Sequence, residues 1–484
     1  MNRNNIWIHV GLAVVLVTLA AVLGQIERWK TALNVKDTTP VAKKQTAPSD
    51  PIQKGIPEVL VRFKPGFSLD KVRAIAAAHH DKLYDEIESV DGLAVIDDLD
   101  NADASAVAAE YAAMPEVAYA EPNNQIKLDP PVPQSPDEIE LAQARSSNLN
   151  DGVYRTVRLL EGPNDPLLNQ QWAIYNSGQD GGKAGADISA IKAWQKTTGS
   201  EDVVVAVLDS GVDFNHVDLK GNMWTRPAGV PAYKDDELGE FNDYNGFNGT
   251  DAIADPMDDN GHGTHCAGII GAEGDNGEGV VGVNWHVKIM PLKFLGRGGF
   301  GTTEDAIEAI NYAIDRKKHG VNLRVISASW GSNSYSKALG DTIKAAGDAG
   351  ILFVAAAGND GSSNDSRPHY PSNYDLPNVI SVAALDRNDK LASFSNYGVK
   401  TVHVAAPGKD ILSTWLGDNY REASGTSMAT PYVSGIAALV IAHDPSITMA
   451  KLRERLLNAT DKIDALSGKV ASGGRIDAAK AIGN

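Results

Sequence analysis

Continuous apolar segments that alternate with amphipathic ones constrain the fold of this 484-residue chain more than any other feature of its sequence. Residues 203–208, 324–327 and 351–357 are short and rich in valine, isoleucine and alanine, whereas residues 303–318 and 337–349 have helical periodicity. Apolar strands of this kind are buried on both faces, as in a parallel sheet that helices cover on both sides. We therefore predict an α/β domain with a mostly parallel sheet over residues 163–484.

The segment before this domain has a different pattern and predicts a second, smaller domain. Strand-like and helix-like stretches alternate there, over residues 58–63, 69–80, 92–96, 102–114 and 117–122. This order favours a small α+β domain of ferredoxin-like type over residues 55–127. Residues 128–162 begin with several prolines, are acidic and lack periodicity, so we expect a cleavable linker there.

The N-terminus has the composition of a targeting segment followed by a tether. Arg3 precedes a nearly unbroken apolar run over residues 6–24. Residues 1–30 therefore predict a signal peptide, or an uncleaved signal anchor, because the run is close to the length that spans a bilayer. Residues 31–54 are polar and contain proline, as in a linker. We expect the protein to be secreted, or anchored at the outer side of the membrane by this segment.

Charge and cysteine content narrow the class of protein further. The formal net charge is −18 at pH 7, which argues against a nucleic-acid partner because a basic binding surface is missing. Cys266 is the only cysteine, so an intramolecular disulfide is excluded. An exported protein without disulfides needs another stabilising element, and a bound Ca²⁺ ion is one candidate.

Three polar residues stand in motifs that mean little when taken one at a time. Asp209 follows an apolar strand-like run, His262 lies between two glycines, and Ser427 precedes an apolar helix at residues 432–442. Each could be a helix cap or a turn residue. Together they supply what amide hydrolysis needs: a nucleophile, a base that takes its proton, and a carboxylate that orients the base. A serine at a helix N-terminus also has backbone N–H groups close to a developing negative charge.

In the order Asp, His, Ser, these motifs resemble those of the subtilisin-like serine proteases, and the thermitase-like branch is the most similar. The resemblance runs from about residue 164 to the C-terminus. It implies a serine endopeptidase that forms an acyl-enzyme on Ser427, with His262 as the general base and Asp209 orienting that base. It also implies that Asn359, after an apolar strand, donates a hydrogen bond to the oxyanion beside a backbone N–H.

The same resemblance implies how an extended peptide is held, since a bound peptide pairs its backbone with enzyme strands. Two short segments match those that flank the substrate backbone, and further residues match the wall of the specificity pocket: Gly299, Phe300, Gly301, Ser329, Trp330, Gly331, Ala356, Gly358 and His369. His369 stands where many relatives have a small residue. We therefore expect a pocket that is shorter or more polar than in those relatives.

A calcium site is implied by matches to three parts of the thermitase-type site. Side-chain oxygens would come from Asp165, Asp218 and Asn276, and backbone carbonyls from Glu278 and Val280. A solvated acidic turn is the alternative interpretation. A further acidic stretch could hold a second ion, although its spacing departs from the family's loop: Asp251, Asp255, Asp258 and Asp259.

Residues 55–127 resemble the propeptides of these proteases, which assist folding and inhibit the enzyme until they are cleaved. The chain is therefore predicted to be a monomeric zymogen whose own propeptide is an intramolecular inhibitor and whose substrates are proteins or peptides. An ordinary accessory domain is the alternative for this segment. Two other function classes stay open, namely a metal hydrolase that uses His262, His265 and acidic residues, and a catalytically silent binding module.

Overall fold

The computed structural model describes residues 58–129 and 162–483, apart from Asp236 and Ile253, and all of these belong to one folded unit, Lys54–Asn484. The predicted signal segment, the tether and most of the predicted 128–162 linker lie outside the described residues. Within the described ranges, no helix combines the length and the apolar character needed to cross a membrane.

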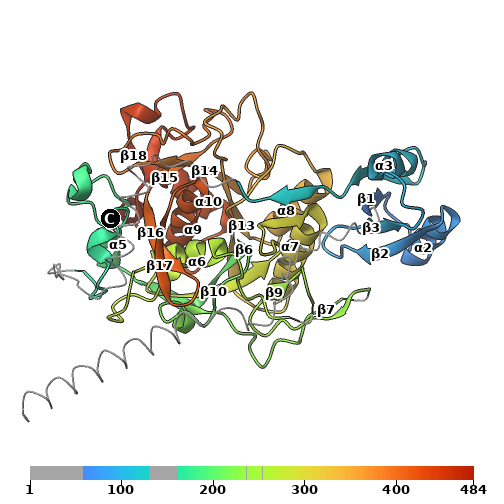
Figure 1. Ribbon diagram of the computed structural model, residues 1–484, viewed down its shortest axis with the longest axis horizontal. Helices are drawn as coiled ribbons and strands as arrows, with labels where there is room; N and C mark the ends of the chain where they lie inside the picture. Colours follow the sequence, from blue (N-terminus) through green and yellow to red (C-terminus); the bar gives the residue numbers. More distant parts are fainter. Residues whose placement is uncertain (1–57, 130–161, 236, 253, 484) are drawn as a thin grey trace, which may run out of the picture. The chain divides into compact units, whose positions relative to one another are not determined.

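A nine-stranded sheet forms the centre of the larger domain and has the predicted parallel pairing (Figure 1). The strand order is β18-β19-β15-β14-β13-β12-β6-β10-β9, and each neighbouring pair is parallel except β18 with β19. In chain order, the strands are β6 (Gly199–Asp209), β9 (Phe247–Asn248), β10 (His286–Lys293), β12 (Leu323–Ala328), β13 (Leu352–Ala356), β14 (Val379–Leu385), β15 (Val404–Pro407), β18 (Thr460–Lys462) and β19 (Gly474–Ile476).

Helices cover both faces of this sheet, which explains why its strands are apolar throughout. Val205 and Val207 of β6 belong to the core that contains α6 and α9, whereas Val204, Ala206 and Leu208 belong to the core that contains α7 and α8. The helices are α5 (Ala190–Trp194), α6 (His262–Gly271), α7 (Thr303–Lys318), α8 (Lys337–Asp348), α9 (Thr426–His443), α10 (Met449–Asn458) and α11 (Ala478–Ala481). The fold class predicted for residues 163–484 is confirmed.

Shorter elements surround the central sheet. They are the strands β7 (Lys234–Asp235), β8 (Gly239–Glu240), β11 (Phe300–Thr302), β16 (Ile411–Trp415) and β17 (Asn419–Ala423), and the 3₁₀ turns η1 (Leu168–Gln170), η2 (Gln179–Gly181), η3 (Lys220–Asn222) and η4 (Asp464–Leu466). β16 and β17 form an antiparallel hairpin, which the sequence analysis did not predict.

The N-terminal domain is a four-stranded antiparallel sheet with two helices, as the ferredoxin-like prediction requires. Its strand order is β2-β3-β1-β4. The elements are β1 (Glu58–Phe63), α2 (Leu69–Ala78), β2 (Asp81–Glu86), β3 (Leu93–Asp98), α3 (Ala104–Ala112) and β4 (Val117–Pro122). β2 was not predicted, because two of its inward residues are the buried acids Asp81 and Asp85, so its sequence lacks an apolar alternation.

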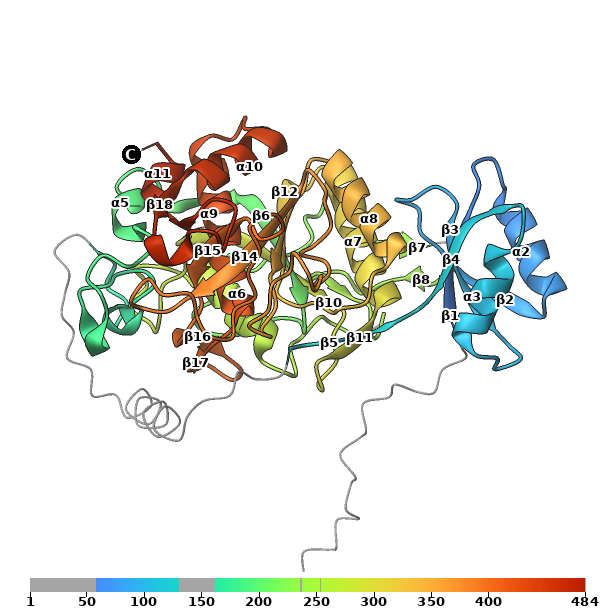
Figure 2. The ribbon, with the colours of Figure 1, turned by 90° about the horizontal axis from the view of Figure 1, so that it is seen from above.

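The open face of this small sheet packs against α7 and α8 (Figure 2). Leu60 and Val95 share a core with residues of both helices. Glu121 lies at the N-terminus of α8, where its carboxylate accepts hydrogen bonds from the backbone N–H groups of Lys337 (2.9 Å) and Ala338 (3.1 Å). A carboxylate at this position satisfies free helix N–H groups and is favoured by the helix dipole.

Candidate active site

Asp209 and His262 come together where β6 ends and α6 begins. His262 Nδ1 lies 2.8 Å from Asp209 Oδ1 and 3.0 Å from Oδ2, and the carboxylate is fully buried. Gly263 permits this approach, because a Cβ there would lie 2.1 Å from the carbonyl oxygen of Gly211 and 3.2 Å from Asp209 Cβ. A carboxylate can only accept, so Nδ1 carries the proton and Nε2 is left to accept one.

The carboxylate also sets the proton affinity of the imidazole. Burial by itself lowers the pKa of His262, but the charge of Asp209 and its hydrogen bond outweigh that effect, so the pKa is raised above the usual histidine value. Asp258 and Asp129 add smaller contributions in the same direction. The imidazolium that forms when this base takes a proton is therefore stabilised.

Ser427 and Asn359 face one another across Gly425. A Cβ at Gly425 would lie 2.7 Å from Ser427 Oγ and 3.5 Å from Asn359 Nδ2. Ser427 is the second residue of α9, and Asn359 follows β13. Asn359 Oδ1 accepts hydrogen bonds from the backbone N–H of Thr426 (2.8 Å) and from its hydroxyl (3.0 Å), which directs Nδ2 toward the space beside Ser427.

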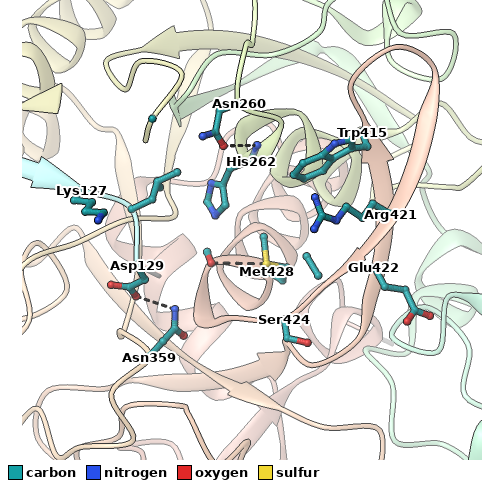
Figure 3. Close-up of a pocket in the computed structure, with 14 residues that line it drawn as sticks. Lys127, Asp129, Asn260, His262, Asn359, Trp415, Arg421, Glu422, Ser424 and Met428 are labelled. Atoms are coloured by element: carbon teal, nitrogen blue, oxygen red, sulfur yellow. Dashed lines mark hydrogen bonds between the residues drawn. The ribbon is translucent and has the colours of Figure 1, made fainter. Parts of the chain in front are cut away.

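The end of the N-terminal domain continues into this space as an extended strand. β5 (Gln125–Lys127) pairs antiparallel with β11, and the backbone N–H of Leu128 donates to the carbonyl of Gly299 at 2.8 Å. The next residue, Asp129, accepts a hydrogen bond from Asn359 Nδ2 at 2.8 Å (Figure 3). A peptide segment thus lies along the groove beside Ser427, with a carboxylate on the Asn359 amide.

Sequence comparisons assign this arrangement to a family. The profile of the subtilase family matches residues 200–474, and that of the fervidolysin N-terminal prodomain matches residues 56–123. The chain belongs to the subtilase family.

Similar proteins support the same assignment. The thermophilic serine proteinase of a Bacillus species is 37% identical over 317 residues, which cover 65% of this chain and 71% of that protein. Thermitase of Thermoactinomyces vulgaris is 35% identical over 320 residues, or 66% of this chain and 99% of that protein. A solved protease structure from Pseudoalteromonas arctica is 30% identical, with a TM-score of 0.54, and covers 66% of this chain and 98% of that one. This subtilase is a serine endopeptidase with an N-terminal prodomain, as expected of a zymogen.

The subtilase has an open cavity of about 400 Å³ whose lining includes Lys127, Leu128 and Asp129. His262, Ser427 and Met428 line it together with Trp415 and Arg421 from the β16–β17 hairpin (Figure 3). The Arg421 guanidinium lies 4.6 Å from the centre of the Trp415 ring. Sequence reasoning missed both hairpin residues, since no local pattern connects them to the motif around Ser427.

The two predicted substrate segments differ in their contacts. Gly299 pairs with the prodomain strand through Leu128, and Ser329 donates its hydroxyl hydrogen bond to the carbonyl of Ser427 at 2.8 Å. The Trp330 side chain is only 1% exposed and packs against Phe294, with ring centres 4.8 Å apart. The indole of Trp330 is therefore part of the core and does not line a groove.

Three of the five predicted calcium ligands come together through their side chains. Asn276 Nδ2 donates to Asp218 Oδ1 at 2.9 Å, and the N–H groups of Asp275 and Val280 donate to Asp165 and Asp218. Asp165 Oδ1 is buried and has no hydrogen-bond partner among the described residues. Burial is the main cause that raises the pKa of Asp165 to about 7 and that of Asp218 to about 6. Two buried carboxylates of this kind fit a hard cation.

The further acidic stretch has other partners. Asp258 binds the N-terminal turn of α6, accepting from the backbone N–H groups of Gly261 and Thr264 at 2.9 Å each. Asp259 forms an ion pair with Lys293 at 2.8 Å. These carboxylates therefore stabilise the loop before His262.

His265, which the metal-hydrolase interpretation requires, faces away from the groove. Its Nε2 donates to the carbonyls of Ile411 (3.0 Å) and Arg421 (2.9 Å), and burial lowers its pKa to about 3. Cys266 is fully buried one turn after His262, with Sγ 3.5 Å from the carbonyl oxygen of Ser427. Both residues pack beneath the groove.

Replacing Asp209 with asparagine should lower the pKa of His262, because the negative charge that favours the imidazolium is removed. An NMR titration of the imidazole in a Ser427→Ala background measures this shift. Asp348→Asn, an exposed aspartate whose partner is Lys344, is the matched control and should leave the titration unchanged. An unaltered pKa in Asp209→Asn would contradict the electrostatic coupling.

Proposed function

We propose that this subtilase is an exported zymogen of a calcium-stabilised endopeptidase, with Ser427 as nucleophile, His262 as general base, Asp209 as its orienting carboxylate and Asn359 as oxyanion donor. One observation carries the proposal: the His262–Asp209 pair, Ser427 and the Asn359 amide surround a groove in which an extended peptide segment already pairs with β11. Attack on a backbone carbonyl needs a nucleophile, a base and an oxyanion donor around one groove, and this grouping of residues supports those roles.

Acylation begins when Ser427 Oγ bonds to the carbonyl carbon of the substrate. The hydroxyl proton passes to His262 Nε2, and the carbonyl oxygen becomes an oxyanion that accepts hydrogen bonds from Asn359 Nδ2 and from a backbone N–H at the start of α9. His262 then gives its proton to the leaving amine as the C–N bond breaks. Water hydrolyses the acyl-enzyme by the same route and restores Ser427.

Asn359 suits this role because its amide orientation is held by Thr426 through two hydrogen bonds to Oδ1. A donor held in advance loses little energy to reorganisation when the oxyanion forms. The loss of one such donor typically lowers turnover by about 10²–10³-fold.

The prodomain blocks this chemistry in the uncleaved chain. Leu128 and Asp129 lie along the groove, and the Asp129 carboxylate accepts the Asn359 N–H that the oxyanion would use. The contact of Glu121 with α8 and the shared apolar core hold the small domain beside α7 and α8. Cleavage after this segment and release of the prodomain are therefore the activating steps. The apolar run at residues 6–24 supports export, with anchoring as the alternative.

Labelling of Ser427 tests the proposed function. The matured protein should react with a fluorophosphonate probe and hydrolyse casein, and Ser427→Ala should abolish both. Ser467→Ala, at an exposed serine directly after η4, is the control and should keep both the labelling and the casein hydrolysis. Casein hydrolysis that persists in Ser427→Ala would refute the serine mechanism, and its immediate loss on adding a chelator would favour the metal hydrolase. A protein that is neither labelled nor active would be the silent binding module.

Calcium should stabilise the subtilase through Asp165 and Asp218. Asp218→Asn is expected to lower the melting temperature in millimolar Ca²⁺, since a ligand at 100 times its dissociation constant stabilises by about 2.7 kcal/mol. Both carboxyls hold protons more tightly than usual without the ion, so calcium must displace protons, and its affinity should rise with pH through about 6 to 7. Calorimetric titration at several pH values measures this. Equal calcium dependence in Asp218→Asn and in the Asp348→Asn control would contradict the site.

Alkaline pH should loosen the prodomain. Asp85 of β2 lies with Asp235 and Glu308 in a group whose carboxylate oxygens are within 4.8 Å, and burial, then the charge of Asp235, raises the pKa of Asp85 to about 8. A free aspartate has a pKa of about 3.9, so the docked state binds more protons. Docking is therefore strongest at low pH and weakens as pH rises toward 8.

Thermal unfolding of the full Ser427→Ala chain at several pH values measures this effect. We expect a lower midpoint at pH 8 than at pH 6, and a flatter dependence in Asp85→Asn, which cannot ionise. Asp91→Asn, at an exposed prodomain aspartate, is the control and should keep the original slope. The same slope in Asp85→Asn would rule out Asp85 as its source.

A further inference from the structure

His369, which the sequence assigns to the specificity pocket, is a buried histidine whose ring lies between two glycines. His369 is 3% exposed. A Cβ at Gly331 would lie 2.1 Å from its Cε1, and a Cβ at Gly358 would lie 3.0 Å from its Cδ2. Both glycines belong to the predicted pocket wall, so the imidazole would fill the end of that predicted pocket. A long or aromatic side chain therefore lacks the depth that it needs there.

The backbone of His369 is held firmly, yet its ring Nδ1 has no hydrogen-bonding partner among the described residues. The backbone of His369 is fixed, because its N–H donates to Asn373 Oδ1 at 3.1 Å and its carbonyl accepts from the Ser372 hydroxyl at 2.7 Å. Nδ1 is buried without a hydrogen-bond partner among the described residues. Nε2 faces the carboxylate of Asp129, with 3.8 Å between Nε2 and Oδ1. Nε2 is therefore the ring nitrogen that can donate a hydrogen bond to an acceptor beside Asn359.

The prodomain strand shows which residue of a bound peptide meets this ring. Leu128 is the last residue that pairs with Gly299, and Asp129 follows it at Asn359, beside Ser427 (Figure 3). Because Asp129 follows the last residue paired with Gly299, we assign it to P1, the residue whose carbonyl Ser427 attacks. In the uncleaved chain its carboxylate holds the Asn359 amide. In a substrate complex the P1 carbonyl would take that amide and leave the P1 carboxylate to His369, which lies 3.8 Å from the Asp129 carboxylate.

We propose that His369 is a specificity-determining residue that makes this subtilase prefer a short acidic residue, aspartate before glutamate, at P1. This inference rests on the proposed function and names its substrate class. Among the residues assigned to the pocket, only His369 has a titratable side chain, the others being Ser329, Trp330, Gly331, Ala356 and Gly358. A carboxylate accepts from an imidazole N–H, and no acidic pocket residue repels it. Aspartate fits the shortened pocket best, and an apolar P1 side chain would leave the ring unpaired.

Peptides that differ only at P1 test the proposal. Fluorogenic substrates with Asp, Glu, Asn, Leu or Phe at P1 are compared by kcat/KM on the matured enzyme. We expect Asp to exceed both Asn and Leu by about 10- to 100-fold, as for a hydrogen bond to a charged group. His369→Gly should remove the preference for Asp and raise cleavage after Leu and Phe, because the pocket deepens.

Two further variants keep the result interpretable. His369→Gln retains an N–H donor and much of the volume, so it should fold like the parent and reduce the Asp-to-Asn ratio without opening the pocket to Phe. His286→Gln, at an exposed histidine on β10, is the control and should leave all ratios unchanged.

The outcomes separate this inference from the proposed function. Two results would overturn the inference alone. One is an enzyme that is labelled at Ser427 but prefers Leu or Phe at P1. The other is a ratio of kcat/KM for Asp over Asn that neither His369 variant changes from the parent value. A protein that is neither labelled at Ser427 nor active on any peptide would overturn the proposed function and this inference with it.

Discussion

The parallel register of the central sheet is the constraint on which the rest of the structure depends. Leu208 of β6 is paired with Ala328 of β12, and Ala328 with Ala355 of β13, so three strands end at nearly the same level. The residues that follow them, Asp209, Ser329 and the segment leading to Asn359, therefore meet at one edge. Helices α6 and α9 pack on one face of these strands and bring the other two members of the candidate triad to that edge.

The same edge is where the prodomain acts. The carboxylate of Glu121 accepts hydrogen bonds from backbone N–H groups at the start of α8. The strand β5, which follows the small domain, pairs with β11. Under the proposed function, inhibition and substrate binding use one set of backbone hydrogen bonds, those of β11. A segment that occupies the groove in this way also indicates which side chains the groove can bind. For this reason we use Asp129 to infer the specificity of the mature enzyme.

Much of the fold could be predicted because burial leaves a clear pattern. The helix expected over residues 303–318 is α7, and the strands expected at 58–63 and 117–122 are β1 and β4. β2 was missed because its inward positions include two buried acids, Asp81 beside Tyr111 within the small domain and Asp85 beside Glu308 of the larger domain. The hairpin that carries Trp415 and Arg421 was missed because its place in the groove depends on packing against α6.

The sequence by itself determined the chemistry available to this protein: three specific motifs, an amide after a strand, and an N-terminal domain of the prodomain type. Residue types and local spacing suffice for that, since each motif is short and contiguous. Only the tertiary structure decided how these groups meet, because their contacts join positions far apart in the chain. Long-range packing decides three such features. Asn359 contacts Thr426, the Trp330 indole is buried in the core, and His369 lies between Gly331 and Gly358.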